Sequence, residues 1–247
     1  MASNRDTAMN SVTARLRALL LLLAAAVAAP AQANLTVHPM RLPVHDGRAG
    51  QIRVYSQTSK VQYVQTRVLR LDQPGTPEEK EVEVRPGNQD GVVVTPGRFV
   101  LASGGNRLVR VISLESVRQE TPYRVYFEGV PPPQEETTDE EATETPTANV
   151  GVSLIWGALV HVIPAQPVPD MRLDGADLHN IGNVRLGVTS IKACTAPKQC
   201  TDHALERSLY PGARMALPFD PAGVTQVIVS YRLSYQGYKN YTRSLTP

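Results

Sequence analysis

Residues 106–129 read NRLVRVISLESVRQETPYRVYFEG, and both ends of this stretch alternate between apolar and polar side chains. Residues 106–114 and 123–129 therefore predict two β-strands, because successive side chains of a strand point to opposite faces of a sheet. Such alternation is typical of an antiparallel sheet with one buried and one solvated face. The stretch favours an all-β fold.

The same pattern recurs on both sides of this stretch. Before it, strands are expected at 34–44, 51–56, 61–71, 79–84 and 91–101, and after it at 149–163. About seven strands over roughly 110 residues is the count of an immunoglobulin-like sandwich. Further strands are expected at 185–192, 214–219, 226–235 and 238–245. The predicted fold class is therefore all-β, with two immunoglobulin-like β-sandwich domains.

Two segments of unusual composition separate these parts. Residues 164–169 (PAQPVP) indicate a stiff linker, which divides the chain into domains at 34–163 and 164–247. Residues 131–147 are rich in Pro, Glu and Thr and hold no large apolar residue, so they predict a flexible acidic loop. That loop immediately precedes the strand expected at 149–163.

The first 33 residues have the order of an export signal. Three arginines precede an unbroken apolar run at 18–29, and Ala31-Gln32-Ala33 offers a cleavage site after Ala33. The run is too short to span a bilayer as a helix, so no membrane insertion is expected. Met9 is an alternative to Met1 as the start of this signal.

Charge argues against a nucleic-acid binder. The whole chain carries a formal net charge of +2. Its first 33 residues contribute three arginines and one aspartate, so the remainder holds equal numbers of acidic and basic residues. A domain that binds nucleic acid by charge would be strongly basic instead.

The chain has two cysteines, Cys194 and Cys200, in CTAPKQC. In an exported protein they are expected to form a disulfide, here across a hairpin loop. A metal site would recruit His203, but that spacing matches no common zinc pattern and lacks a fourth ligand. No metal is expected.

Patterns of catalysis are absent from the sequence. It contains no G-x-S-x-G, no H-E-x-x-H and no phosphate-binding glycine loop, and its five histidines are scattered. We therefore expect no enzymatic reaction and no cofactor.

Several short motifs resemble those of one family. Residues 95–101 (TPGRFVL), with the Gly and Val-Arg that follow, resemble its P-x-R-F-x-L…G…V-R segment, and 120–125 (ETPYRV) its E-x-x-Y-R motif. In the second domain, 180–183 (NIGN) resembles its N-x-G-N, and 209–212 (LYPG) its P-G segment. The order of these motifs over 34–247 resembles the periplasmic chaperones of the chaperone–usher pilus assembly pathway.

This resemblance implies a function in the periplasm without catalysis. The two domains would form an L with a cleft, bind incomplete pilus subunits (pilins) by donor-strand complementation, and deliver them to an outer-membrane usher. A second copy of the chain is a further possible partner, in a self-capping dimer.

The resemblance also implies which residues bind the pilin. Arg41 stands where the family has a basic residue on its first strand, which binds the C-terminal carboxylate of the pilin. Val150, Val152 and Leu154 fall on the alternating apolar residues of the donor strand, expected within 149–163, and Trp156 continues their face.

The sequence departs from the family at the cleft. Leu159 stands where a lysine is usual, and His161, on the same side of the strand, is the expected replacement. Ile163 and Ser234 replace an arginine and an aspartate, so the usual ion pair between the domains cannot form, although Glu120 is retained in a structural role. These changes indicate a divergent branch of the family.

Three other functions compete with this one. A pilus subunit would be a single sandwich with an N-terminal extension, which this chain lacks. An enzyme would need a catalytic constellation. The leading alternative is an envelope module of two immunoglobulin-like domains that binds proteins without acting as a chaperone.

Overall fold

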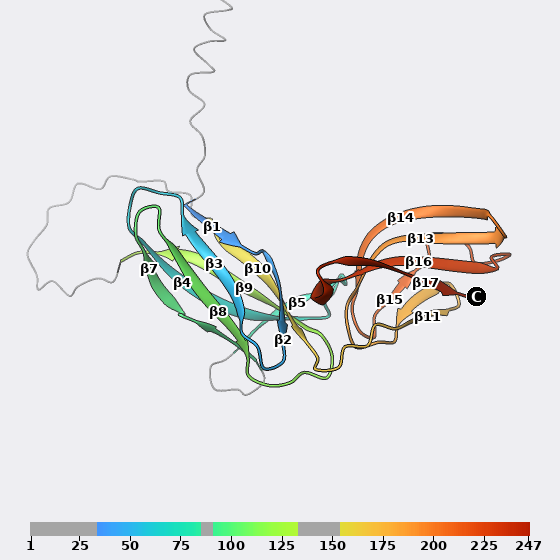
Figure 1. The fold of residues 1–247 in the computed structure, drawn as a ribbon, viewed down its shortest axis with the longest axis horizontal. Coiled ribbons are helices and arrows are strands. Elements are labelled where there is room, and N and C mark those ends of the chain that lie inside the picture. The colour runs from blue at the N-terminus through green and yellow to red at the C-terminus, as the bar shows by residue number, and fades with distance from the viewer. Residues whose placement is uncertain (1–33, 85–90, 133–153) are drawn as a thin grey trace, which may run out of the picture. The chain divides into compact units, whose positions relative to one another are not determined.

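The computed structural model describes residues 34–84, 91–132 and 154–247. These residues form 17 strands and one short 3-10 helix, which confirms the all-β prediction (Figure 1). Two separate clusters of buried apolar residues lie in the chain, one before and one after the linker predicted at 164–169. Each cluster is enclosed by two sheets.

The first sandwich holds strands β1 to β10. They are β1 (Leu35–His38), β2 (Arg41–His45), β3 (Gly50–Ser56), β4 (Gln62–Asp72), β5 (Lys80–Glu83), β6 (Val92–Thr95), β7 (Arg98–Leu101), β8 (Asn106–Ser113), β9 (Thr121–Val130) and β10 (Trp156–Ile163). One sheet has the order β1-β3-β8-β6, and the other has the order β2-β10-β9-β4-β5 with β7 paired to β4. All pairs are antiparallel except β10 with β2.

Two segments that the sequence predicts as single strands pass from one sheet to the other. β1 pairs with β3, but β2 pairs with β10, and the change occurs at Pro39. Likewise β6 pairs with β8 and β7 with β4, and the Pro96-Gly97 pair lies between them. Proline has no N–H for the ladder, so each change of sheet comes where pairing has to stop.

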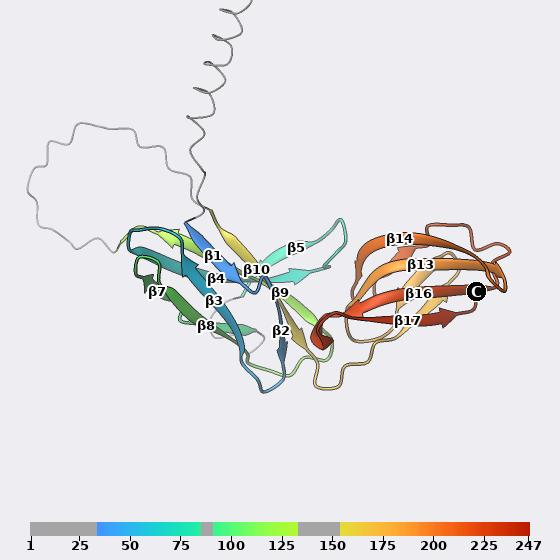
Figure 2. The same cartoon turned by 45° about the horizontal axis from the view of Figure 1, so that its top comes forward.

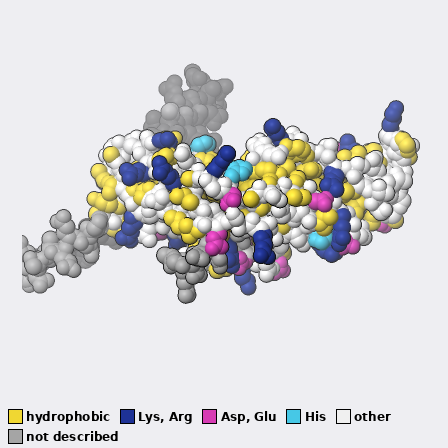
Figure 3. Space-filling view, turned by 60° about the horizontal axis from the view of Figure 1, so that its bottom comes forward, with side chains coloured by type: hydrophobic (Ala, Val, Ile, Leu, Met, Phe, Trp, Pro, Cys, Tyr) yellow, Lys and Arg dark blue, Asp and Glu magenta, His cyan; other side chains and the backbone are white. Residues whose placement is uncertain are grey.

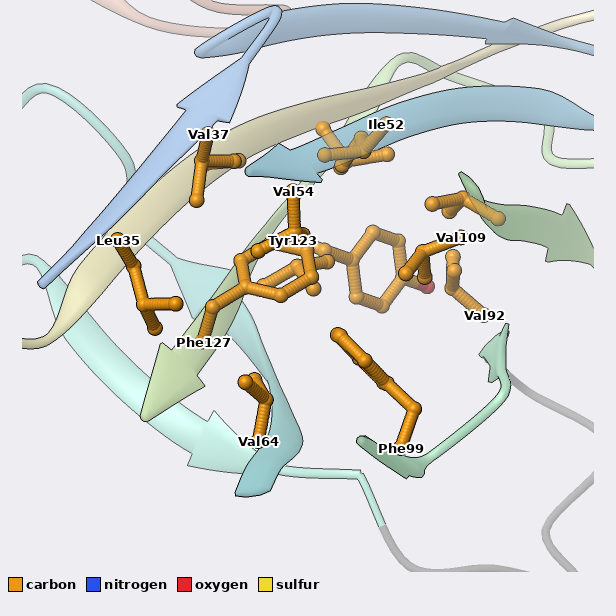
Figure 4. Packing of buried hydrophobic residues seen from close by; sticks show 14 of the residues in the cluster. Leu35, Val37, Ile52, Val54, Val64, Val92, Phe99, Val109, Tyr123 and Phe127 are labelled. Atoms are coloured by element: carbon orange, nitrogen blue, oxygen red, sulfur yellow. The ribbon is translucent and has the colours of Figure 1, made fainter. Parts of the chain in front are cut away.

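The core of the first sandwich is built from alternate residues of both sheets (Figure 4). Phe127 and Val125 of β9 and Ile52 of β3 are fully buried. Figure 4 shows the rings of Tyr123 and Phe127 in the middle of this core, surrounded by valine, leucine and isoleucine side chains. The alternation in the sequence therefore does select the buried face.

The second sandwich is smaller (Figure 2). Its elements are β11 (Met171–Asp174), β12 (Asp177–Asn180), β13 (Leu186–Ala196), β14 (Gln199–Leu209), β15 (Arg214–Ala216), β16 (Gln226–Leu233), η1 (Ser234–Gln236) and β17 (Lys239–Leu245). A sheet of order β11-β12-β15 faces one of order β14-β13-β16-β17.

Three strands of this sandwich, β11, β12 and β14, were not predicted. β14 is the longest of them, and only its last residue, Leu209, is buried. Because an exposed edge strand need not alternate, its sequence carries no period of two. β11 and β12 have only four residues each, too few to show a period.

Some predictions fall on parts of the chain outside the described residues. These are the export signal at 1–33, Val150, Val152 and all but the start of the acidic loop at 131–147. Among the described residues, no helix has the length and apolar character to cross a membrane.

The predicted disulfide between Cys194 and Cys200 is present. The two cysteines are paired residues of β13 and β14, so the bond closes the hairpin between these strands. This location confirms the expected bridge across a hairpin loop.

Replacing both cysteines by serine should lower the free energy of unfolding by about 2 kcal/mol, because the bond removes loop entropy from the unfolded chain. Urea unfolding, with the wild-type protein in reducing agent as control, measures the effect. Equal stability of oxidised and serine forms would contradict this account.

Candidate functional site

The first half of β10 has an unpaired edge. On one side, β10 is paired with β9 from Trp156 to Val162. On the other side, the ladder with β2 begins only at Leu159, opposite Arg41. Among the described residues, no strand is hydrogen-bonded to that side of Trp156–Ala158. Unpaired N–H and C=O groups on such an edge can accept a strand from another chain.

Exposed apolar side chains lie directly before this edge. Leu154 and Ile155 expose 47% and 49% of their surface. Trp156 is half-buried and packs against the core of its own sandwich, so only part of its ring is accessible. Of the predicted donor residues, the structure thus describes Leu154 as available to a partner.

Arg41 and Leu159 are neighbours across the β2–β10 ladder. Arg41 is exposed at the start of β2, and Leu159 is half-buried on β10. Paired residues of adjacent strands project to the same face of a sheet. The structure therefore brings these two predicted site residues together.

Glu120 is a buried carboxylate at the junction of the two sandwiches. It is 2% exposed. Its Oε2 accepts a hydrogen bond of 2.7 Å from the backbone N–H of Arg185, the residue directly before β13. Its Oε1 lies 2.8 Å from Nδ1 of His161, on β10. The contact with His161 lacks the geometry of a regular hydrogen bond, so it is a charge contact rather than a directed one.

The location of His161 corrects one expectation. His161 is 1% exposed, so it does not stand on the wall of a cleft and does not replace the missing lysine there. Its ring stacks on that of Tyr210, with centroids 6.2 Å apart. Burial raises the pKa of Tyr210 to about 12, so its hydroxyl is neutral at physiological pH. His161 and Tyr210 fill the junction beside Glu120.

The N-x-G-N motif at 180–183 completes this junction. The backbone N–H of Glu120 donates to the carbonyl of Asn183 at 2.8 Å, and the Asn183 amide binds the linker at Gln166 and Val168. A Cβ on Gly182 would lie 2.3 Å from the carbonyl oxygen of Val168, so only glycine allows this approach. The motif that marked the family in the sequence is thus a structural device between the sandwiches.

A groove of about 200 Å³ lies beside Arg41. Its lining includes four arginines, Arg41, Arg185, Arg207 and Arg232, and one acid, Glu206. Sequence reasoning did not single out Arg185. It directly follows the N-x-G-N motif and a valine, and no spacing in the sequence indicates that it faces Arg41.

Elsewhere, charge is mixed. On the face shown in Figure 3, Lys and Arg side chains stand in several separate groups with acidic side chains between them. The arginine-lined groove is therefore a local concentration of positive charge in a chain that is otherwise balanced.

The chain is similar to proteins of fimbrial assembly. No family model matches it. A protein of the CS1 fimbriae of Escherichia coli is 30% identical over 192 residues, which cover 74% of this chain and 79% of that protein. A protein of the CFA/I fimbriae of Escherichia coli is 29% identical over 189 residues, covering 73% of this chain and 78% of that protein.

Solved structures give the same picture. The crystal structure of the class 5 fimbriae chaperone CfaA has a TM-score of 0.71 at 26% identity, covering 87% of this chain and 100% of that chain. A chain of the Salmonella enterica SafA pilin complex with the SafB chaperone has a TM-score of 0.54 at 13% identity, covering 89% of this chain and 99% of that chain. These likenesses confirm the predicted two-domain immunoglobulin-like fold.

Replacing Glu120 by alanine should lower the free energy of unfolding by about 3 kcal/mol, because the buried Arg185 N–H and His161 lose their partner. Glu120→Gln should cost less, since its amide oxygen still accepts from Arg185. Urea unfolding, with the exposed Glu83→Ala as the control variant, measures both. A Glu120→Ala protein as stable as the control would refute the role given to this carboxylate.

Proposed function

We propose that this chain, which belongs to the family of fimbrial chaperones of the chaperone–usher pathway, captures incomplete fimbrial subunits by donating a strand to them. The observation that carries the proposal is the unpaired edge of β10 at Trp156–Ala158, preceded by the exposed Leu154 and Ile155. A strand edge next to exposed apolar side chains is what strand addition requires.

Strand addition answers a physical difficulty of the fimbrial subunit. An immunoglobulin-like fold that lacks one strand exposes an apolar groove between two unpaired edges, and would aggregate. A donated strand pairs with both edges through main-chain hydrogen bonds, which give affinity with little dependence on sequence. Its alternate side chains fill the groove, and here these are Val150, Val152 and Leu154.

The energy of this contact is sufficient to complete a fold. Burying one Val or Leu side chain contributes roughly 1.5–3 kcal/mol, so three contribute about 5–9 kcal/mol before ordering costs. Domains are stable by about 5–15 kcal/mol in total. The donated strand therefore contributes on the scale of a whole domain's stability.

Arg41 is the proposed anchor for the C-terminal carboxylate of the fimbrial subunit. It is exposed, and it lies at the start of β2 where the β2–β10 ladder begins. A guanidinium binds a carboxylate through two parallel hydrogen bonds, which fix the position as well as adding affinity. The anchor would thus set the register in which the fimbrial subunit meets the donated strand.

The place of action is the periplasm. Residues 1–33 would direct export and be cleaved after Ala33. The complex with the fimbrial subunit would then pass to an outer-membrane usher. When no fimbrial subunit is bound, the same apolar residues could pair two copies of the chain, which would cap each other.

The double substitution Val152→Asp, Leu154→Asp should abolish capture, because two charges would enter an apolar groove. The tagged chain is purified from its native periplasm, and bound fimbrial subunits are identified by mass spectrometry. Val61→Asp, at an exposed valine outside the donor segment, is the matched control. Identical partners for the double variant and the wild type would instead favour the envelope-module alternative.

Arg41→Ala should reduce the yield of captured fimbrial subunit at least tenfold, since a charge-assisted bidentate contact contributes about 1.5–3 kcal/mol. Arg53→Ala, at an exposed arginine of β3, is the control. The yield of co-purified subunit per chaperone is compared in the same periplasmic extract. An unchanged yield with Arg41→Ala would rule out the anchor.

A further inference from the structure

Arg185 is an arginine that is 8% exposed and yet lines the groove beside Arg41. Its Nε donates to Oγ of Ser208 at 3.0 Å, which fixes the plane of the guanidinium. Its two terminal nitrogens lie over Gly187, 3.4 and 3.5 Å from where a Cβ would stand. A larger residue at 187 would crowd this guanidinium.

The charge of Arg185 is not balanced by an acid of the chain. Within the described residues, neither Arg185 nor Arg41 forms an ion pair. The single acidic side chain of the groove lining, Glu206, is exposed to solvent. A nearly buried cation without a counter-ion is costly, unless a ligand supplies the opposite charge.

The backbone of Arg185 is held in place from the other sandwich. Its N–H donates to the buried Oε2 of Glu120 at 2.7 Å. Arg41, in turn, is fixed by the ladder of β2 with β10. The two guanidinium groups therefore come from different sandwiches and face one groove from rigid elements, as a preorganised site requires.

We propose that Arg185 is a second anchor for the C-terminal carboxylate of the fimbrial subunit, which it holds together with Arg41. Arg185 supplies the cation that is missing at Leu159, but from the second sandwich instead of the donor strand. This inference rests on the proposed function and adds a specificity-determining residue to it. A carboxylate between two planar forks can accept up to four hydrogen bonds in a fixed orientation.

The remaining arginines of the groove have a weaker role in this scheme. Arg207 and Arg232 are exposed, and Nε of Arg232 already donates to Oδ1 of Asn240 at 2.9 Å. They raise the positive potential that attracts an anion. Arg185 is the nearly buried arginine among the four, and a desolvated charge interacts more strongly than an exposed one.

The test measures capture of fimbrial subunits by four forms of the full chain, exported with its own signal. They are the wild type, Arg185→Gln, Arg185→Gln with Leu159→Lys, and the control Arg214→Gln, which changes an exposed arginine of β15. Arg185→Gln should retain less than about a tenth of the wild-type yield of co-purified subunit. Leu159→Lys should restore it severalfold, because it adds a cation opposite Arg41, and Arg214→Gln should match the wild type.

Three results would overturn the inference. They are wild-type capture by Arg185→Gln, failure of Leu159→Lys to restore capture, and an equal loss with Arg214→Gln. If Arg185→Gln does not fold, as judged by thermal unfolding, Arg185→Lys decides. It keeps the charge but not the planar fork, so it should lower capture severalfold, and wild-type capture would again overturn the inference.

A second readout separates a carboxylate of the fimbrial subunit from a free anion. The melting temperature of the purified chain is compared in sulfate and in chloride of equal ionic strength. A sulfate stabilisation that depends on Arg185, together with capture that does not, would make the groove a simple anion site and overturn the inference. Absence of fimbrial subunits from the wild-type sample would overturn the proposed function itself, and the inference with it.

Discussion

The buried carboxylate of Glu120 is the interaction on which the arrangement of this site depends. It lies at the end of one sandwich and satisfies a backbone N–H of the other, while its second oxygen faces His161 on β10. A carboxylate that is 2% exposed is stable only with such partners. The donor strand, the linker motif and the groove arginine therefore share one anchoring point, and a change at any of them is felt at the others.

This junction replaces the ion pair that the sequence cannot form. Ile163 and Ser234 are both buried, with 1% and 2% exposure, so neither position leaves room for a long charged side chain. The link between the sandwiches is instead a carboxylate bonded to backbone, with a histidine beside it. Backbone donors do not depend on the side chain at 185, which leaves the Arg185 guanidinium free to face the groove.

The sequence predicted the parts of the fold that have a period. Alternation located the buried strands of the first sandwich, and the cysteine spacing located the hairpin bridge. It did not predict β14, because an exposed edge strand has no apolar face to mark it. It also placed His161 on a cleft wall, since parity along a strand gives the face of a residue but not what packs on that face. Arg185 could not be found at all, because its role arises only where two sandwiches meet.

The open edge and the basic groove are linked by the short length of β2. Because β2 pairs with β10 only from Leu159 onward, the first half of β10 is left for a partner strand, and Arg41 lies where the occupied half begins. A partner strand that extends the open half would thus end beside Arg41, at the groove that Arg185 also lines. The same break in pairing that exposes the donor edge therefore determines where the partner's terminal charge must be held.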